Sequence, residues 1–323
     1  MEKSNLQVSL IKDTSQKGIW QYSYYLSPLP EEFRITLSEG NTPEIEIEKD
    51  VYLKREDQNP TGSVKDRGMA YLISWAKSKG IVNLALSSSG NSAISAAAYC
   101  QVAGIKLNIF VSDKIQTEKL EKIKSFGFPC FISQRPVSEA IKFAQKNKVV
   151  NLRPSIQPFG PEGYQTLAFE IAEKFGLIED IFLPVSSGVT LVGLAKGFLK
   201  LGFLPRLHLC QSAFFCPLAS IFDHDFQKDS VNLTTSLVAR SVPLKKEILT
   251  IIKESKGDGI VVENTKIMEA SRIFTQKNIF TSYEGALAFA AFLKAKKMGK
   301  KLGKTVCLLT GKKYPQGNKA NDQ

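Results

Sequence analysis

Short apolar runs alternate along most of the chain with longer stretches in which apolar residues recur three and four positions apart. The short runs predict β-strands and the longer stretches predict α-helices. The predicted strands are residues 45–47, 51–53, 82–86, 107–111, 130–132, 149–151, 181–184, 207–210, 260–262 and 305–309. The predicted helices are residues 67–79, 92–103, 117–126, 138–147, 164–175, 190–200, 264–278 and 284–298. Residues 1–37 and 212–258 follow neither period clearly, so we predict no order of elements there.

Strict alternation of strand and helix is typical of an α/β fold with right-handed crossovers and parallel sheets. The chain has 323 residues, more than one ordinary hydrophobic core holds. Three prolines and two glycines between residues 151 and 163 indicate a passage between domains. We therefore predict two three-layer αβα domains with parallel-dominated sheets. Residues 69–155 form the small domain in this prediction, residues 156–323 the large domain, and residues 1–68 an N-terminal extension and part of the large domain.

The turn before the helix at residues 67–79 carries a lysine in an unusual place. Asn59-Pro60-Thr61-Gly62 has turn chemistry, because proline fixes φ and glycine accepts a positive φ. Ser63 stands where a helix cap belongs, so Lys65 falls in the first helical turn, where the helix dipole disfavours a positive charge. A lysine shifted toward its neutral amine can form a Schiff base with a carbonyl. Spacing alone also allows an ordinary exposed lysine, with Asp66 and Arg67 as supports of the turn.

Three further loops follow predicted strands, at the sheet edge where open α/β sheets bind ligands. In Ser186-Ser187-Gly188-Val189-Thr190, small residues let backbone N–H groups approach a phosphate at a helix N-terminus. The segment from Ser87 to Asn91 offers hydroxyls and an amide to a carboxylate or a phenolate, and Thr310 offers one neutral hydroxyl. Each loop alone is an ordinary polar turn. Together with Lys65 they match the aldehyde, phosphate, phenolic oxygen and ring nitrogen of pyridoxal 5′-phosphate.

Composition and charge narrow the classes of function. Hydrophobic residues make up 43% of the chain and charged residues 23%, as in soluble globular proteins. No apolar run approaches the roughly 20 residues of a membrane span, and the N-terminus lacks an apolar signal core, so we expect a cytoplasmic protein. Much of the net charge of +12 comes from lysines near the C-terminus, and no aromatic residues stand between these lysines as single-strand nucleic-acid binding requires. Five cysteines without C-x-x-C spacing and two histidines predict neither disulfides nor a metal site.

Three segments resemble a known enzyme family. Glu39-Gly40-Asn41-Thr42-Pro43, the turn from Asn59 to Arg67, and Ser88-Ser89-Gly90-Asn91 look like motifs of the fold-type II pyridoxal-phosphate enzymes, the tryptophan synthase β-subunit superfamily. The order and spacing match from about Ser38 to Thr310. Within that superfamily, the segment from Gly163 to Glu173 resembles the threonine synthase branch.

The resemblance implies a cofactor between the two domains and a role for each candidate residue. Lys65 would form the Schiff base and, when released, carry protons. The other implied cofactor-binding residues are Asn91 at the phenolic oxygen, Ser186, Ser187, Gly188, Val189 and Thr190 at the phosphate, and Thr310 at the ring nitrogen. The implied substrate-binding residues are Ser88, Ser89 and Asn91, which would hold a carboxylate. No metal is implied, the partner is a small amino acid, and a homodimer is possible.

The specific reaction has more than one reading. The threonine synthase reading is conversion of O-phosphohomoserine and water to threonine and phosphate. Val64 stands directly before the lysine, and a valine at this position resembles the cysteine synthases. We therefore keep β-elimination or β-replacement on serine, threonine or an activated serine as an alternative. A non-catalytic binding protein with the same fold is the third reading, and the retained Lys65, Asn91 and Thr310 argue against it.

Overall fold

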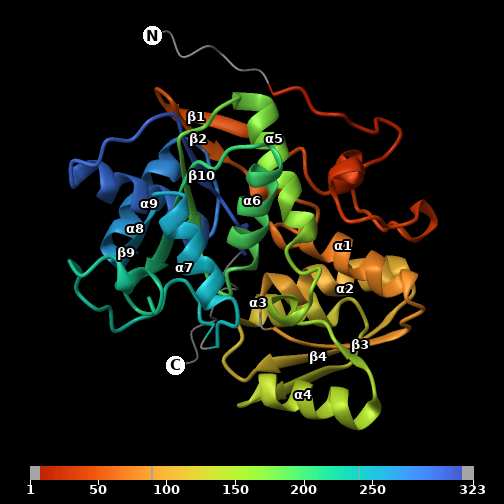
Figure 1. The fold of residues 1–323 in the computed structure, drawn as a ribbon. Coiled ribbons are helices and arrows are strands. Elements are labelled where there is room, and N and C mark those ends of the chain that lie inside the picture. Colours follow the sequence, from red (N-terminus) through yellow and green to blue (C-terminus); the bar gives the residue numbers. More distant parts are fainter. Residues whose placement is uncertain (1–7, 89, 240, 315–323) are drawn as a thin grey trace.

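Two separate β-sheets organise the chain (Figure 1). The computed structural model describes residues 8–88, 90–239 and 241–314. The larger sheet has the order β1–β2–β10–β7–β8–β9, with β1 at Glu44–Glu48, β2 at Val51–Lys54, β10 at Thr305–Leu308, β7 at Asp180–Pro184, β8 at Arg206–Ser212 and β9 at Asp258–Val262. The smaller sheet has the order β5–β4–β3–β6, with β5 at Cys130–Ser133, β4 at Lys106–Ser112, β3 at Asn83–Ser87 and β6 at Val150–Asn151.

Parallel pairing dominates both sheets. In the larger sheet only β1 and β2 pair antiparallel, around the turn at Asp50, while β10 pairs parallel with both β2 and β7. All pairs described in the smaller sheet are parallel. The carboxyl ends of β2, β10 and β7 therefore meet at one edge, which brings together three loops that are far apart in the sequence. The predicted α/β class with parallel-dominated sheets is confirmed.

Helices cover both faces of each sheet, which gives the predicted three layers (Figure 1). On the larger sheet, one face carries α5 (Gln165–Phe175), α6 (Val189–Lys200) and α7 (Lys245–Glu254), and the other carries α8 (Asn264–Gln276) and α9 (Tyr283–Lys297). On the smaller sheet, one face carries α1 (Lys65–Ser78), α2 (Asn91–Ala103) and α3 (Thr117–Lys124), and the other carries α4 (Pro136–Asn147). The domain limits at residues 68 and 155 stay a prediction, although strands β3 to β6 all lie between them.

Most element boundaries lie within two or three residues of their predicted positions. The first helix differs in a useful way: it begins at Lys65, and the N-cap position is Val64, not Ser63. Ser63 still contributes, because its Oγ accepts a hydrogen bond from the Lys65 N–H at 3.3 Å. In the region that followed no clear period, α7 forms with its apolar residues Ile248, Ile251 and Ile252 buried against the large-domain core.

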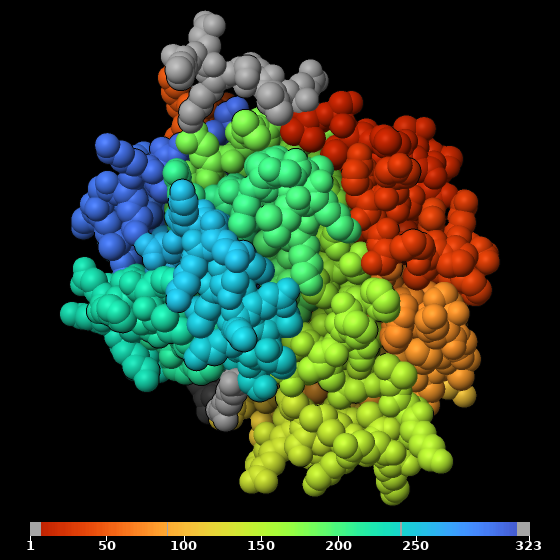
Figure 2. Space-filling model, viewed as in Figure 1, coloured from red at the N-terminus to blue at the C-terminus, as the bar shows by residue number. Residues whose placement is uncertain are grey.

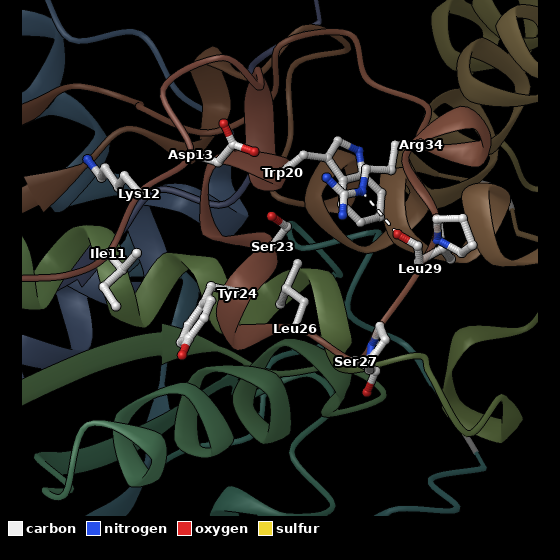
Figure 3. Close-up of a pocket in the computed structure, with 12 residues that line it drawn as sticks. Ile11, Lys12, Asp13, Trp20, Ser23, Tyr24, Leu26, Ser27, Leu29 and Arg34 are labelled. Carbon is white, nitrogen blue, oxygen red and sulfur yellow. Dashed lines mark hydrogen bonds between the residues drawn. The ribbon is translucent and has the colours of Figure 1, made fainter.

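The N-terminal segment packs beside α1 and α5 and has its own pocket (Figure 3). The pocket has a volume of about 600 Å³ and is lined by both apolar and charged side chains of this segment. Arg34 lies over the Trp20 ring at 5.5 Å and donates to the Leu29 carbonyl at 3.1 Å. None of the predicted site residues lines it.

All five cysteines carry free thiols, with Cys130 and Cys216 partly exposed. None of the helices in the described part of the chain has the length and apolar character that crossing a membrane requires.

Candidate active site

The turn that leads from β2 into α1 is bound to the segment that follows β10. The Val64 N–H donates to the Thr310 carbonyl at 3.1 Å, and the Lys312 N–H donates to the Gly62 carbonyl at 2.8 Å. Ser63 and Gly311 form an isolated antiparallel bridge between these hydrogen bonds. The first residue of α1, Lys65, and the predicted ring-nitrogen partner Thr310 are therefore held on adjacent backbone segments.

A buried ionic network lies beneath this turn. Arg67, fully buried, donates to both carboxylate oxygens of Glu56 at 2.7 Å and to both of Glu170 at 2.8 Å. Lys54 joins Glu170 at 2.9 Å. Burial would raise the pKa of Glu170, but Arg67 and Lys54 outweigh burial and hold that pKa at about 2. The network also reaches the Glu39–Pro43 motif, because the Asn41 N–H donates to Glu170 at 2.8 Å.

Asp66 supports the turn from the other side of α1. Its carboxylate accepts from the Thr61 N–H at 2.7 Å and from the Thr61 hydroxyl at 2.5 Å. Burial raises the pKa of Asp66 to about 6, against the opposing hydrogen bonds of Ser95 and Thr61. The interpretation of Asp66 and Arg67 as supports of the turn therefore agrees with their contacts.

The Lys65 amine lies between α1 and α6. Its Nζ donates to the Thr190 hydroxyl at 3.3 Å and lies 5.7 Å from the centre of the Tyr164 ring. Burial lowers the pKa of Lys65 to about 8. Near neutral pH the amine can therefore both release and accept a proton, as a nucleophile or a general base requires.

The loop between β7 and α6 forms a cradle for an anion. Ser186 and Ser187 are half-buried, and Gly188 ends the loop with φ at +83°. A Cβ at Gly188 would overlap with Ile248, so this backbone position requires glycine. The first N–H groups of α6 have no side-chain cap, which leaves them available to a phosphate. The Val189 side chain is buried among the apolar residues beneath the larger sheet, so only its backbone can contribute to anion binding.

The smaller sheet brings a second loop to the same place. This loop leads from β3 into α2, and the Asn91 Nδ2 lies beside Gly311, 2.6 Å from where a Cβ of Gly311 would stand. The Asn91 Oδ1 is buried and has no hydrogen-bond partner among the described residues. Ser88 lies one residue beyond β3, and its Oγ accepts from the Gly90 N–H at 3.4 Å. Ser89 lies outside the described residues, so its predicted role is not placed.

The sequence did not single out two cations that the structure places beside the smaller sheet. Lys119, on α3, is 7% exposed and donates to the Ser236 hydroxyl at 3.0 Å; that hydroxyl stands 3.4 Å from where a Cβ of Gly90 would be. Arg153 follows β6, the neighbour of β3, and donates to the Ser241 carbonyl at 2.8 Å. In Figure 2 the cyan surface of residues 241–255 lies against the yellow-green surface near residue 150.

Lys119 and Arg153 bond neutral oxygens, not carboxylates, in the part of the chain that the structure describes. Burial lowers the pKa of both side chains, and Glu284 and Glu118 partly oppose the change at Lys119. Sequence reasoning missed this pair because their partners, Ser236 and Ser241, belong to residues 212–258, where the sequence predicts no order of elements. Tyr164 was missed as well, since it was read only as the first apolar position of a helix.

Comparisons with known proteins agree with this geometry. Residues 35–311 match the family model described as "Pyridoxal-phosphate dependent enzyme". A threonine synthase of Methanocaldococcus jannaschii is 28% identical over 91% of this chain and 80% of the relative. A threonine synthase of Synechocystis sp. is 30% identical over 86% of this chain and 77% of the relative. The structure of maize serine racemase shares the fold, with a TM-score of 0.73 and 18% identity over 85% of this chain and 89% of that chain. The chain therefore belongs to the family of pyridoxal-phosphate-dependent enzymes.

Proposed function

We propose that this enzyme is a carbon–oxygen lyase of the threonine synthase type, which converts O-phosphohomoserine and water to threonine and phosphate. The observation that carries the proposal is the buried Lys119 beside the predicted substrate loop, with Arg153 at the same sheet edge. The Lys119 amine donates its described hydrogen bond to a neutral hydroxyl, and Glu284 and Glu118 only partly offset the cost of its burial, which favours an anionic group on the substrate. Relatives named threonine synthase at 28–30% identity support the same reading.

The residues present fit pyridoxal 5′-phosphate. The Asn91 amide lies beside Gly311 with its buried Oδ1 unpaired among the described residues, and its Nδ2 is the donor that a phenolic oxygen needs. The Gly188 turn opens the N-terminus of α6 to an anion. In our proposal Lys65 holds the cofactor's aldehyde carbon and Asn91 its phenolic oxygen, while the segment from Ser186 to Thr190 holds its phosphate and Thr310 faces its ring nitrogen. When bound, the cofactor supplies an electron sink that makes the substrate's C–H bonds acidic.

The protein's own groups then bind the substrate and move protons. Ser88 and Ser89 hold the substrate carboxylate, and Lys119 and Arg153 attract the phosphate that leaves. The Lys65 amine, with its pKa lowered to about 8 by burial, takes a proton from one substrate carbon and returns it to another. The neutral hydroxyl of Thr310 adds no charge at the ring nitrogen, which suits elimination and replacement.

Val64 supports a second candidate, β-elimination or β-replacement on serine, threonine or an activated serine. Its side chain is 1% exposed and packs with Tyr164 in the large-domain core, directly before Lys65. A small side chain directly before the lysine is a feature that this chain shares with cysteine synthases. In this reading, Lys119 and Arg153 would bind a leaving group other than phosphate.

Product analysis of the cofactor-loaded protein tests the proposal. We expect phosphate release from O-phosphohomoserine with formation of threonine, and loss of both with Lys65→Ala. Keto-acid formation from serine or threonine without phosphate release would reject the threonine synthase reading in favour of the second candidate.

Lys119→Met tests the anion-binding role directly. Loss of a charge-assisted hydrogen bond is expected to raise KM for O-phosphohomoserine by about tenfold or more. Lys122→Met is the matched control, because Lys122 is exposed on the same helix. Equal KM values for the two variants would remove Lys119 from the substrate site.

A further inference from the structure

The segment that follows β10 crosses from the larger sheet to the smaller part of the molecule. Backbone hydrogen bonds fix its course: the Gly311 carbonyl accepts from the Ser282 N–H at 2.9 Å, and the Lys312 N–H donates to the Gly62 carbonyl at 2.8 Å. Two residues later, the Tyr314 ring packs against the apolar core that α1 and α2 share with the smaller sheet. The segment therefore places Tyr314 where the two parts of the molecule meet.

Two lysine amines lie over the Tyr314 ring. The Lys119 Nζ is 5.8 Å from the centre of the ring, and the Lys312 Nζ is 5.2 Å from the same centre. Both distances are within the roughly 6 Å at which the face of an aromatic ring attracts a cation. Lys119 belongs to α3 and Lys312 to the segment after β10, so this one ring joins two lysines that are far apart in the sequence.

Further contacts hold each lysine at the border of the candidate site. Lys119 donates to the Ser236 hydroxyl at 3.0 Å, and that hydroxyl stands 3.4 Å from where a Cβ of Gly90 would be. The aliphatic stem of Lys312 lies over Gly62, in the turn that leads to the first residue of α1, and a Cβ at Gly62 would overlap with this stem. Lys119 is therefore held beside the predicted substrate loop, and Lys312 beside the lysine-bearing turn.

The two amines form a site with more positive charge than its neighbours offset. The hydrogen bond described for the Lys119 amine goes to a neutral hydroxyl, and Glu284 and Glu118 offset only part of the cost of burying its charge. Two like charges at one ring repel each other, so the arrangement favours an anion that binds both. A phosphate monoester carries about −1.5 to −2 charge at neutral pH and matches two amines better than a monoanion does.

We propose that Lys119 and Lys312 together form an anion subsite for a phosphate monoester, and that Tyr314 is the positioning residue whose ring holds both amines. The proposal rests on the role proposed for Lys119 and narrows its ligand from anions in general to phosphate monoesters. Positioning matters because a long, flexible side chain that turns freely loses rotamer freedom when it binds. Lys122 and Lys124, on the same helix as Lys119, are exposed and have no such ring contact with Tyr314 among the described residues.

Binding of inorganic phosphate to the cofactor-loaded, full-length protein tests the subsite, measured by isothermal titration calorimetry. In our proposal the cofactor fills the cradle at residues 186–190, so added phosphate reports on the second anion site. We expect Lys312→Met to raise the Kd for phosphate by about tenfold, and the Kd for acetate, a monoanion, by less. Lys313→Met is the matched control, because Lys313 is the exposed neighbour of Lys312. We expect no change there.

Two Tyr314 variants separate positioning by the ring from a general loosening of the segment. Tyr314→Leu should raise the Kd for phosphate by about fivefold, whereas Tyr314→Phe keeps the face of the ring and should stay within about twofold of the wild type. Combining Tyr314→Leu with Lys119→Met should cost less affinity than the two single losses added together, because the ring acts partly through Lys119.

Four outcomes would overturn the proposal. They are absence of phosphate binding by the wild type, wild-type affinity in Lys312→Met, equal losses in Tyr314→Leu and Tyr314→Phe, and fully additive losses in the double variant. No turnover is measured in this experiment, so its failure is distinct from failure of the O-phosphohomoserine assay.

Discussion

Replacement of Arg67 is the sharpest test of how the lysine-bearing turn is supported. Arg67→Met preserves much of the side-chain volume but leaves Glu56 and Glu170 buried without their main partner. A pKa lowered from 4.5 to about 2 at Glu170 corresponds to about 3 kcal/mol of stabilisation. Breaking a buried ion pair from one side typically costs about 3–5 kcal/mol. We expect Arg67→Met to lower the free energy of unfolding by an amount in that range.

The dependence on pH follows from the sign of the change at Glu170. Its folded pKa lies below the ordinary value of 4.5, so the stabilisation is present above about pH 4.5 and lost as the pH falls toward 2. Without Arg67 this loss is absent. The difference in unfolding free energy between the wild type and Arg67→Met should therefore narrow by about 1 kcal/mol or more between pH 7 and pH 4.

Urea unfolding of the cofactor-loaded protein, followed by circular dichroism, measures these differences. Lys296→Met is the control, since Lys296 pairs with Glu48 on the surface and should cost no more than about 0.5 kcal/mol. Adding Glu170→Gln to Arg67→Met should restore about 1 kcal/mol, because one buried charge is removed. A cost below about 1 kcal/mol for Arg67→Met, or a double variant less stable than Arg67→Met, would refute the reasoning.

Two further outcomes are expected. Gly188→Ala should weaken cofactor binding by about tenfold or more, because the new Cβ strains a backbone at φ +83° and overlaps with Ile248. Adding Ile248→Ala should recover part of the lost affinity. Equal cofactor affinities of Gly188→Ala and the wild type in absorbance titrations would contradict this prediction. Asp66→Asn should remove a pH dependence of stability, because the folded pKa of Asp66, about 6, lies above its ordinary value of 3.8 and the wild type therefore loses stability as the pH rises through 4 to 6. The same slope of unfolding free energy against pH in both proteins, measured by urea unfolding, would contradict this pKa.

The strand and helix pattern of this chain was predictable where local order is strong. Residues 82–151 and 181–210 show regular alternation, and their elements appear close to the predicted positions. The loops after β3, β7 and β10 were predictable as site candidates because ligands bind at the carboxyl ends of parallel strands, although β3 lies in the smaller sheet and β7 and β10 lie in the larger one. The helix α7 was not predicted, since the irregular region around it hides its short apolar stripe, and its burial depends on a core built by α6 and β8.

The side chains that complete the site were harder to predict than the loops. Lys119 looks like one of several lysines on a charged helix, and its contacts with Ser236 and the Tyr314 ring, far along the chain, distinguish it. Tyr164 fits between α1 and α6 only because Gly68 and Gly193 leave room for it. Arg67 likewise pairs with Glu170, which lies 103 residues further along the chain, as well as with the nearby Glu56. Such contacts depend on the tertiary fold, which no local period encodes.

The central place of β10 has a consequence for how the protein is made. This strand lies between β2 and β7, yet the ribosome adds it long after both. Until residues 305–312 emerge, β2 and β7 have no shared neighbour, and the backbone bonds that fix Gly62 and Val64 cannot form. The small-domain sheet has all its strands much earlier in synthesis. The lysine turn can therefore reach its final geometry only after the last strand has joined the larger sheet.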